Sequence, residues 1–178
     1  YEDLFQCVAP KTDGTMQRVI KIAEKIKRNK KHYIGFDIPW QLVGILHYME
    51  CNLSFNRHLH NGDPLNKKTV RVPRGRPSNK TRWTWRESAA DAISMKLREK
   101  PSWKNPPVNE HTPNGHLLLM LEEWNGLGYW KKGILSPFLF GNAQRWIYDK
   151  GKYVADGRFD RNARTAQIGA ALLLRALL

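Results

Sequence analysis

The sequence is poor in acidic residues and lacks a long apolar run. Its 178 residues contain 16 Asp and Glu against 30 Lys and Arg, a formal net charge of +14 at pH 7. Such a charge attracts anionic partners, among them nucleic acid, anionic lipid and bacterial cell wall. The apolar stretch Ile168 to Leu178 is interrupted by Gly169 and Arg175 and falls short of the roughly 20 residues that cross a bilayer. We therefore predict a buried C-terminal helix and no membrane span.

Cysteine is also scarce, and the two residues Cys7 and Cys51 leave their own state open. They could pair in an oxidising compartment or remain buried thiols, and neither has the neighbouring base of an activated nucleophile. The chain begins at Tyr1 without a signal-like segment, so we expect a processed or trimmed form. Its length predicts one compact domain over residues 1–178.

Apolar residues recur at helical spacing along most of the chain, which predicts a mostly α fold of about seven helices. A minor β element is predicted at Val70 and Val72, the one alternating apolar pair of a basic segment. The helices are expected within 1–10, from 14 or 15 to about 28, from Pro39 to Leu53, over 88–98 and 115–124, from Ser136 onward, and over 168–178.

The segment from Gly35 to Leu65 contains the candidate catalytic group. Asp37 and Pro39 suit a helix start, because Asp can cap the helix and proline costs nothing in the first turn. Glu50 ends the apolar run, where a helix meets a polar loop; partial desolvation there keeps a carboxyl proton available near neutral pH. Glu50 is therefore the candidate general acid. The predicted core face comprises Leu42, Ile45, Leu46, Met49 and Leu53.

The loop after Glu50 concentrates polar side chains that could line a cleft. Zinc binding is the rival function of this segment. Its candidate ligands lie within seventeen residues: His47, Glu50, His58, His60 and Asp63. The second histidine of H-E-x-x-H is missing, so no metal and no other cofactor is predicted. His47 is interpreted as a partner that holds Glu50. The loop candidates are His58, His60, Asn61 and Asp63.

Residues 67–85 form a basic arm without an acidic residue. Proline or glycine at 73, 75 and 77 predicts an irregular backbone. Trp83 and Trp85 beside basic residues suit the stacking of nucleic-acid bases, but indole also stacks on sugars. We interpret the arm as part of a glycan-binding wall, with nucleic acid as the second interpretation.

Another polar and aromatic group follows the helix predicted over 115–124. Trp124, Asn125 and Tyr129 surround a glycine-rich turn, where Asn125 can both donate and accept hydrogen bonds. A helix that simply ends in a glycine turn would explain the glycines but not these three side chains. Further candidates lie toward the C-terminus: Tyr148, Tyr153, Asp156 and Asp160.

The motifs, taken in order, resemble lysozyme-like cell-wall hydrolases of phages and bacteria. Glu50-Cys51 followed by Phe55 resembles the Glu-Ser-x-x-Phe region of the goose-type lysozyme and lytic transglycosylase superfamily, with cysteine in place of serine. Trp124-Asn125 resembles its Ala-Tyr-Asn-x-Gly element, with tryptophan in place of tyrosine. The motifs are IPW at 38–40, H-x-x-E at 47–50, HLHNGDPL at 58–65, VPRGRP at 72–77, WTW at 83–85, WNGLGY at 124–129 and KGKYVADGRFD at 150–160.

This resemblance implies a lysozyme-like fold and a muramidase that cleaves the MurNAc-GlcNAc β-1,4 bond, with Glu50 as general acid. It implies a secreted or periplasmic monomer whose partner is the peptidoglycan glycan strand, with no specific nucleic acid. The implied substrate-binding residues are His58, His60, Asn61, Asp63, Trp124, Asn125, Tyr129, Tyr148, Tyr153 and Asp156, with His47 in support.

Four questions stay open at this point. Transglycosylases of this superfamily form 1,6-anhydro products without water, and a second carboxylate is not determined among Asp63, Asp156, Asp160 and Glu123. A non-catalytic module for DNA or anionic glycan would use the same charge and tryptophans without Glu50. A superfamily lysozyme of predatory bacteria acts on deacetylated wall, and likeness to it would imply that Asp63, Asp156 or Glu123 receives free amines.

Overall fold

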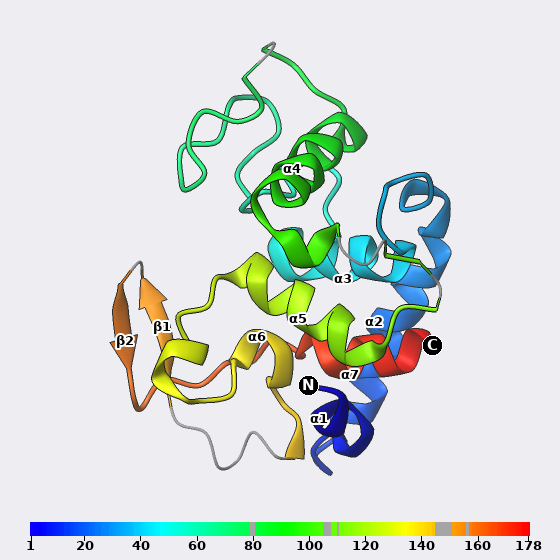
Figure 1. Cartoon of the computed structure of the whole chain (residues 1–178), viewed down its shortest axis with the longest axis vertical. Coiled ribbons are helices and arrows are strands. Elements are labelled where there is room, and N and C mark those ends of the chain that lie inside the picture. The colour runs from blue at the N-terminus through cyan, green and yellow to red at the C-terminus, as the bar shows by residue number, and fades with distance from the viewer. Residues whose placement is uncertain (79–80, 105–107, 110, 145–150, 156) are drawn as a thin grey trace. The chain divides into compact units, whose positions relative to one another are not determined.

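The computed structural model describes residues 1–178 except 79–80, 105–107, 110, 145–150 and 156. The chain divides into two compact units, which we describe separately. Unit 1 comprises Tyr1–Lys27 and Thr112–Leu178, and unit 2 comprises Arg28–His111. Both termini belong to unit 1 (Figure 1). The described residues are mostly helical, with seven α-helices and one small sheet, which confirms the predicted mostly α class.

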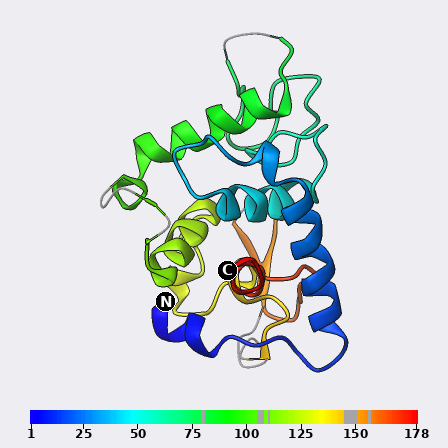
Figure 2. The same cartoon turned by 90° about the vertical axis from the view of Figure 1, so that its right-hand side faces the viewer.

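Unit 1 is built around α5 (Asn114–Asn125), which contacts α1 (Glu2–Cys7), α6 (Pro137–Phe140) and α7 (Ala170–Leu177). Figures 1 and 2 show α5 beside α7. The facing side chains of these helices are apolar and buried, including Leu118, Leu121 and Leu173. Burial of this shared apolar surface holds the short helices together, since none is long enough to be stable alone. The unit also contains most of α2 (Thr15–Arg28), and η3 (Trp130–Lys132).

The amphipathic pattern of α2 predicts its core face only in part. Val19, Ala23 and Ile26 are buried, as the helical spacing predicts. The helical spacing of Met16, Val19, Ile20, Ala23 and Ile26 predicts one buried stripe, but Met16 and Ile20 are 47% and 48% exposed, so that part of the prediction is wrong. Met16 and Ile20 lie at the edge of the predicted stripe. The buried face of α2 is therefore narrower than the apolar stripe in its sequence.

The small sheet of the described residues is a hairpin of β1 (Lys152–Ala155) and β2 (Arg158–Asp160), paired antiparallel. The strand predicted at Val70 and Val72 is wrong, because that segment is a series of bends. The Val70 N–H donates to the side chain of Asp63, so a side chain takes the place of a neighbouring strand.

Unit 2 contains η1 (Lys30–His32), α3 (Trp40–Cys51), α4 (Trp85–Glu99) and η2 (Pro101–Trp103). Helix α4, seen along its length in Figure 2, begins three residues before the predicted Ser88, because Thr84 and Glu87 form a capping box. Trp85 joins α4 to α3: its ring centroid lies 4.4 Å from that of His47. Trp85 is therefore a core residue of unit 2, only 5% exposed.

The limits of α3 differ from those predicted. Pro39 occupies the N-cap position and no side chain caps the helix, so the predicted capping role of Asp37 is wrong. Leu53 lies beyond the helix end, since Asn52 and Leu53 have positive φ angles of 50° and 61°. The Leu53 N–H then donates to the His47 carbonyl at 3.1 Å, which closes the helix terminus.

No helix within the described ranges combines the length and the apolar character needed to cross a membrane. The apolar C-terminal stretch forms α7, whose Ala170–Leu174 segment is buried, as predicted.

Candidate functional site

Glu50 lies in the last turn of α3 at the junction of an apolar helix and a polar loop. Every residue of α3 from Leu42 to Met49 is buried, whereas Glu50 is half-buried. The helix therefore fixes the Glu50 backbone in the core of unit 2 and delivers its side chain to the rim. This is the placement that the sequence predicts for a general acid.

The loop after α3 closes directly against Glu50. A Cβ atom on Gly62 would lie 2.3 Å from the Glu50 carbonyl oxygen, and Gly62 has a φ of +72°. Only glycine satisfies both the contact and the backbone conformation without strain. Arg57 Nη1 donates to the Gly62 carbonyl at 2.8 Å, and the His58 N–H donates to the Asp63 carbonyl at 2.8 Å. The loop is thus held against the end of α3 at its central glycine.

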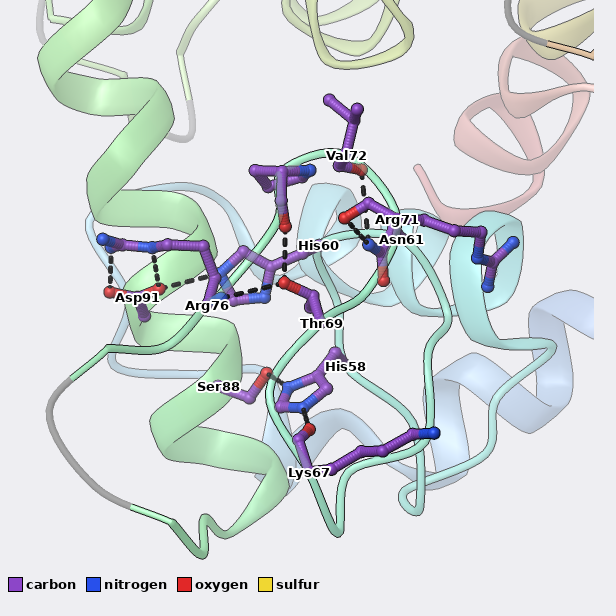
Figure 3. A network of polar contacts seen from close by, with 11 residues as sticks. His58, His60, Asn61, Lys67, Thr69, Arg71, Val72, Arg76, Ser88 and Asp91 are labelled. Atoms are coloured by element: carbon purple, nitrogen blue, oxygen red, sulfur yellow. Dashed lines mark hydrogen bonds and ion pairs between the residues drawn. The ribbon is translucent and has the colours of Figure 1, made fainter.

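The two loop histidines join this loop to α4 (Figure 3). His58 has Nδ1 2.7 Å from Ser88 Oγ and Nε2 2.7 Å from the Lys67 carbonyl oxygen, so both ring nitrogens have partners inside the protein. His60 Nε2 lies 2.8 Å from Asp91 Oδ2. Burial lowers the pKa of His60, and Asp91 opposes that shift. Both histidines therefore attach the loop to α4 through these side-chain contacts.

Asn61 and Asp63 organise the following basic arm. Asp63 Oδ2 accepts the backbone N–H groups of Val70 and Arg71 at 2.8 and 3.0 Å, and Oδ1 accepts from Arg71 Nε at 2.7 Å. Burial alone would raise the pKa of Asp63, but these bonds outweigh it and lower the pKa to about 2. Asn61 Nδ2 donates to the Arg71 and Val72 carbonyls at 3.1 and 3.3 Å. HLHNGDPL and VPRGRP thus form one interlocked network.

His47, which the sequence predicts as a support of Glu50, has its hydrogen-bond partner in Tyr33. Its Nδ1 lies 2.9 Å from the Tyr33 hydroxyl oxygen, and its buried Nε2 has no hydrogen-bond partner among the described residues. Burial lowers the pKa of His47 to about 4, so the ring is neutral at pH 7. The rings of Phe55 and Trp85 lie on it at centroid distances of 4.6 and 4.4 Å. His47 therefore packs among aromatic rings on the buried side of α3.

Cys51 and Cys7 are both free thiols. Burial, together with the neighbouring Glu50 carboxylate, raises the pKa of Cys51 to about 12. Its Sγ donates to the His58 carbonyl at 3.3 Å, which adds another contact between α3 and the loop. Within the part of the chain that the structure describes, no three His, Cys, Asp or Glu side chains gather as metal ligands.

A cavity of about 800 Å³ opens beside the same loop in unit 2. Amide, indole and guanidinium groups contribute to its wall, which is a lining suited to sugar hydroxyl and acetamido groups. Trp83 is the member of the WTW motif that reaches this cavity, whereas Trp85 is in the core. The lining residues are Asn56, Pro64, Leu65, Asn66, Arg82 and Trp83.

Unit 1 brings together three of the other predicted site residues. Asn125, Tyr129 and Tyr153 line a cavity of about 430 Å³ between the turn after α5 and the β-hairpin. The Tyr153 N–H donates to the Tyr129 hydroxyl at 2.8 Å, and their rings meet edge to face at 5.1 Å. Trp124 is not in the lining and is 7% exposed. Asp160 is exposed on β2, and Tyr148 and Asp156 lie outside the described residues.

Glu122 is a notable buried group that the sequence prediction missed. It is 1% exposed, and neither carboxylate oxygen meets a hydrogen-bond donor among the described residues. Burial raises the pKa of Glu122 to about 7, and the nearby Ser136 hydroxyl opposes the shift only in part. Its spacing of four from Leu118 on the core face of α5 is the signal that could have found it.

No family model matches the chain, and no curated protein or solved structure matches it either. The resemblance to cell-wall hydrolases therefore depends on the motifs alone. A function has to be argued from the site.

Proposed function

We propose that the protein is a muramidase that cleaves the MurNAc-GlcNAc β-1,4 bond of peptidoglycan, with Glu50 as general acid. The observation that carries this proposal is the placement of Glu50, half-buried at the end of a buried helix and backed by the close contact of Gly62. Glycoside hydrolysis needs a proton delivered to the leaving oxygen by a carboxyl group held at a fixed position. A rigid helix end supplies that position better than a mobile loop.

Each unit has a cavity whose lining suits a sugar ligand. One in unit 2 presents Asn56, Arg82 and Trp83, and one in unit 1 presents Asn125 and Tyr153. Each combines amide groups with aromatic rings, the pairing that suits acetamido sugars. The net charge of +14 favours approach to an anionic wall.

Transglycosylation is the second candidate, and one observation favours it. The two carboxylates of the loop network are already engaged, because Asp63 pairs with Arg71 and Asp91 pairs with Arg76. A mechanism in which the muramic acid hydroxyl displaces the leaving group needs no second carboxylate. Asp63 was one candidate for binding the free amines of deacetylated wall. It is poorly suited to that role, because Arg71 already pairs with its carboxylate.

The test is digestion of purified peptidoglycan with wild type, Glu50→Gln and the control Glu99→Gln. Glu99 is exposed at the end of α4 in the same unit, so its replacement removes the same charge. We expect Glu50→Gln to bind sacculi while its rate falls roughly 100-fold or more, and Glu99→Gln to digest normally. Mass spectrometry of the fragments separates reducing ends from 1,6-anhydro ends. Digestion by Glu50→Gln at near the wild-type rate would refute the assignment of Glu50. Binding of sacculi without cleavage by wild type would indicate a non-catalytic binding module.

A further inference from the structure

The VPRGRP segment presents two aliphatic side chains to solvent. Val70 and Val72 are 54% and 75% exposed, and Val72 is the most exposed large apolar residue among those described. Single exposed apolar residues are ordinary, but here two of them lie two positions apart on one short segment. Figure 3 shows the Val72 side chain pointing away from the polar network.

The backbone that carries these valines is held in place. Asp63 accepts the N–H groups of Val70 and Arg71, and Asn61 donates to the carbonyls of Arg71 and Val72. Turning the valines inward would break these four bonds, two of which are made to the buried Asp63 carboxylate. The exposure is therefore built into the fold.

Positive charge surrounds the two valines. The sequence from Pro64 to Arg86 contains eight Lys and Arg and no acidic residue. Asp63 pairs with Arg71 and Asp91 pairs with Arg76, whereas Lys67, Lys68 and Arg74 are exposed. The surface thus combines aliphatic side chains with a cationic margin.

We propose that residues 67–76 form a docking surface for an anionic lipid membrane. Val70 and Val72 enter the boundary of the acyl chains, while Lys67, Lys68 and Arg74 meet the lipid phosphates. Valine has no ring face or hydrogen-bonding side-chain group, so it gains little from a glycan or a nucleic acid and gains most from an apolar phase. This proposal does not rest on the muramidase assignment.

The test measures partition of the whole protein onto vesicles of phosphatidylglycerol and phosphatidylcholine in equal parts, against phosphatidylcholine alone. We expect binding to the anionic vesicles only. The double variant Val70→Ser with Val72→Ser keeps every charge and should lower the partition coefficient roughly tenfold, since two partly buried valines are worth about one tenfold step. Arg74→Ala should lower it about fivefold, with the loss shrinking as salt rises.

The matched control is Ile20→Ser with Ile34→Ser, which removes two similarly exposed aliphatic side chains, 48% and 50% exposed, from other segments. It should bind as wild type does. Val72→Ser alone provides a milder variant, and unchanged thermal melts confirm that each protein is folded. Absence of binding by wild type, equal binding by the double valine variant, or an equal loss in the control would each overturn the proposal. Valine-insensitive binding displaced by soluble polyphosphate would mark a site for anionic polymers instead.

Discussion

Replacing Glu122 with glutamine tests whether burial keeps this carboxyl group protonated in unit 1. Glu122 is 1% exposed, and burial raises its pKa from 4.5 to about 7. Among the described residues, the groups near it are Tyr1, Glu123, Tyr129 and Ser136. Burial, with a smaller contribution from Glu122, raises the pKa of Tyr129. None of them is a cation that would stabilise the ionised Glu122 carboxylate.

The sign of the effect follows from where the proton is lost. The unfolded chain releases it near pH 4.5 and the folded chain near pH 7, so the stability contributed by the protonated group is complete below pH 4.5 and lost as pH rises through 7. The interval of about 2.5 pH units, at about 1.4 kcal/mol each, corresponds to about 3.5 kcal/mol. Glutamine cannot ionise, so the variant does not lose this stability. Between pH 4.5 and pH 8, the free energy of unfolding of Glu122→Gln should therefore rise by about that amount relative to that of wild type.

The assay is urea unfolding at a series of pH values, followed by NMR signals of α5, because one optical transition need not report on both compact units. The buried glutamine amide adds a cost of its own, but that cost is the same at every pH and cancels from the trend. Glu123→Gln, on the adjacent half-buried side chain, controls for the loss of one charge. A difference between Glu122→Gln and wild type that stays constant with pH would refute the reasoning.

Two further predictions concern the loop at Glu50. Gly62→Ala should lower the free energy of unfolding by roughly 1–3 kcal/mol more than Gly75→Ala, since both have a positive φ but only the first Cβ meets the Glu50 carbonyl. Equal losses in denaturant titrations would show that the loop yields easily. Asp63→Asn should cost about 2 kcal/mol at pH 7, because the pKa of Asp63 is lowered from 3.8 to about 2. That stability is present above pH 3.8 and lost as pH falls through 2, so wild type and variant should converge in acid; a constant gap between them would contradict the role of Arg71 and its neighbours.

The helices and the position of Glu50 could be predicted from the sequence because their causes are local. Apolar spacing and caps act within a few residues, so α3, α5 and α7 lie near their predicted places. The error at Asp37 has the same origin, since several residues near a helix start can serve as its cap. The half-buried Glu50 follows from the boundary between apolar and polar sequence.

Only the tertiary structure determined what the loop residues do. His58 meets Ser88 across 30 positions and His60 meets Asp91 across 31, pairings that no local pattern indicates. Asp63 replaces a strand partner for the basic arm, which is why the strand predicted there is absent from those described residues. The spacing of Glu122 from Leu118 places it on the core face of α5, but how deeply it is buried depends on the other helices of unit 1 that enclose α5. Long-range hydrogen bonds and burial depend on which segments meet in space, and that is decided by the packing of the whole unit.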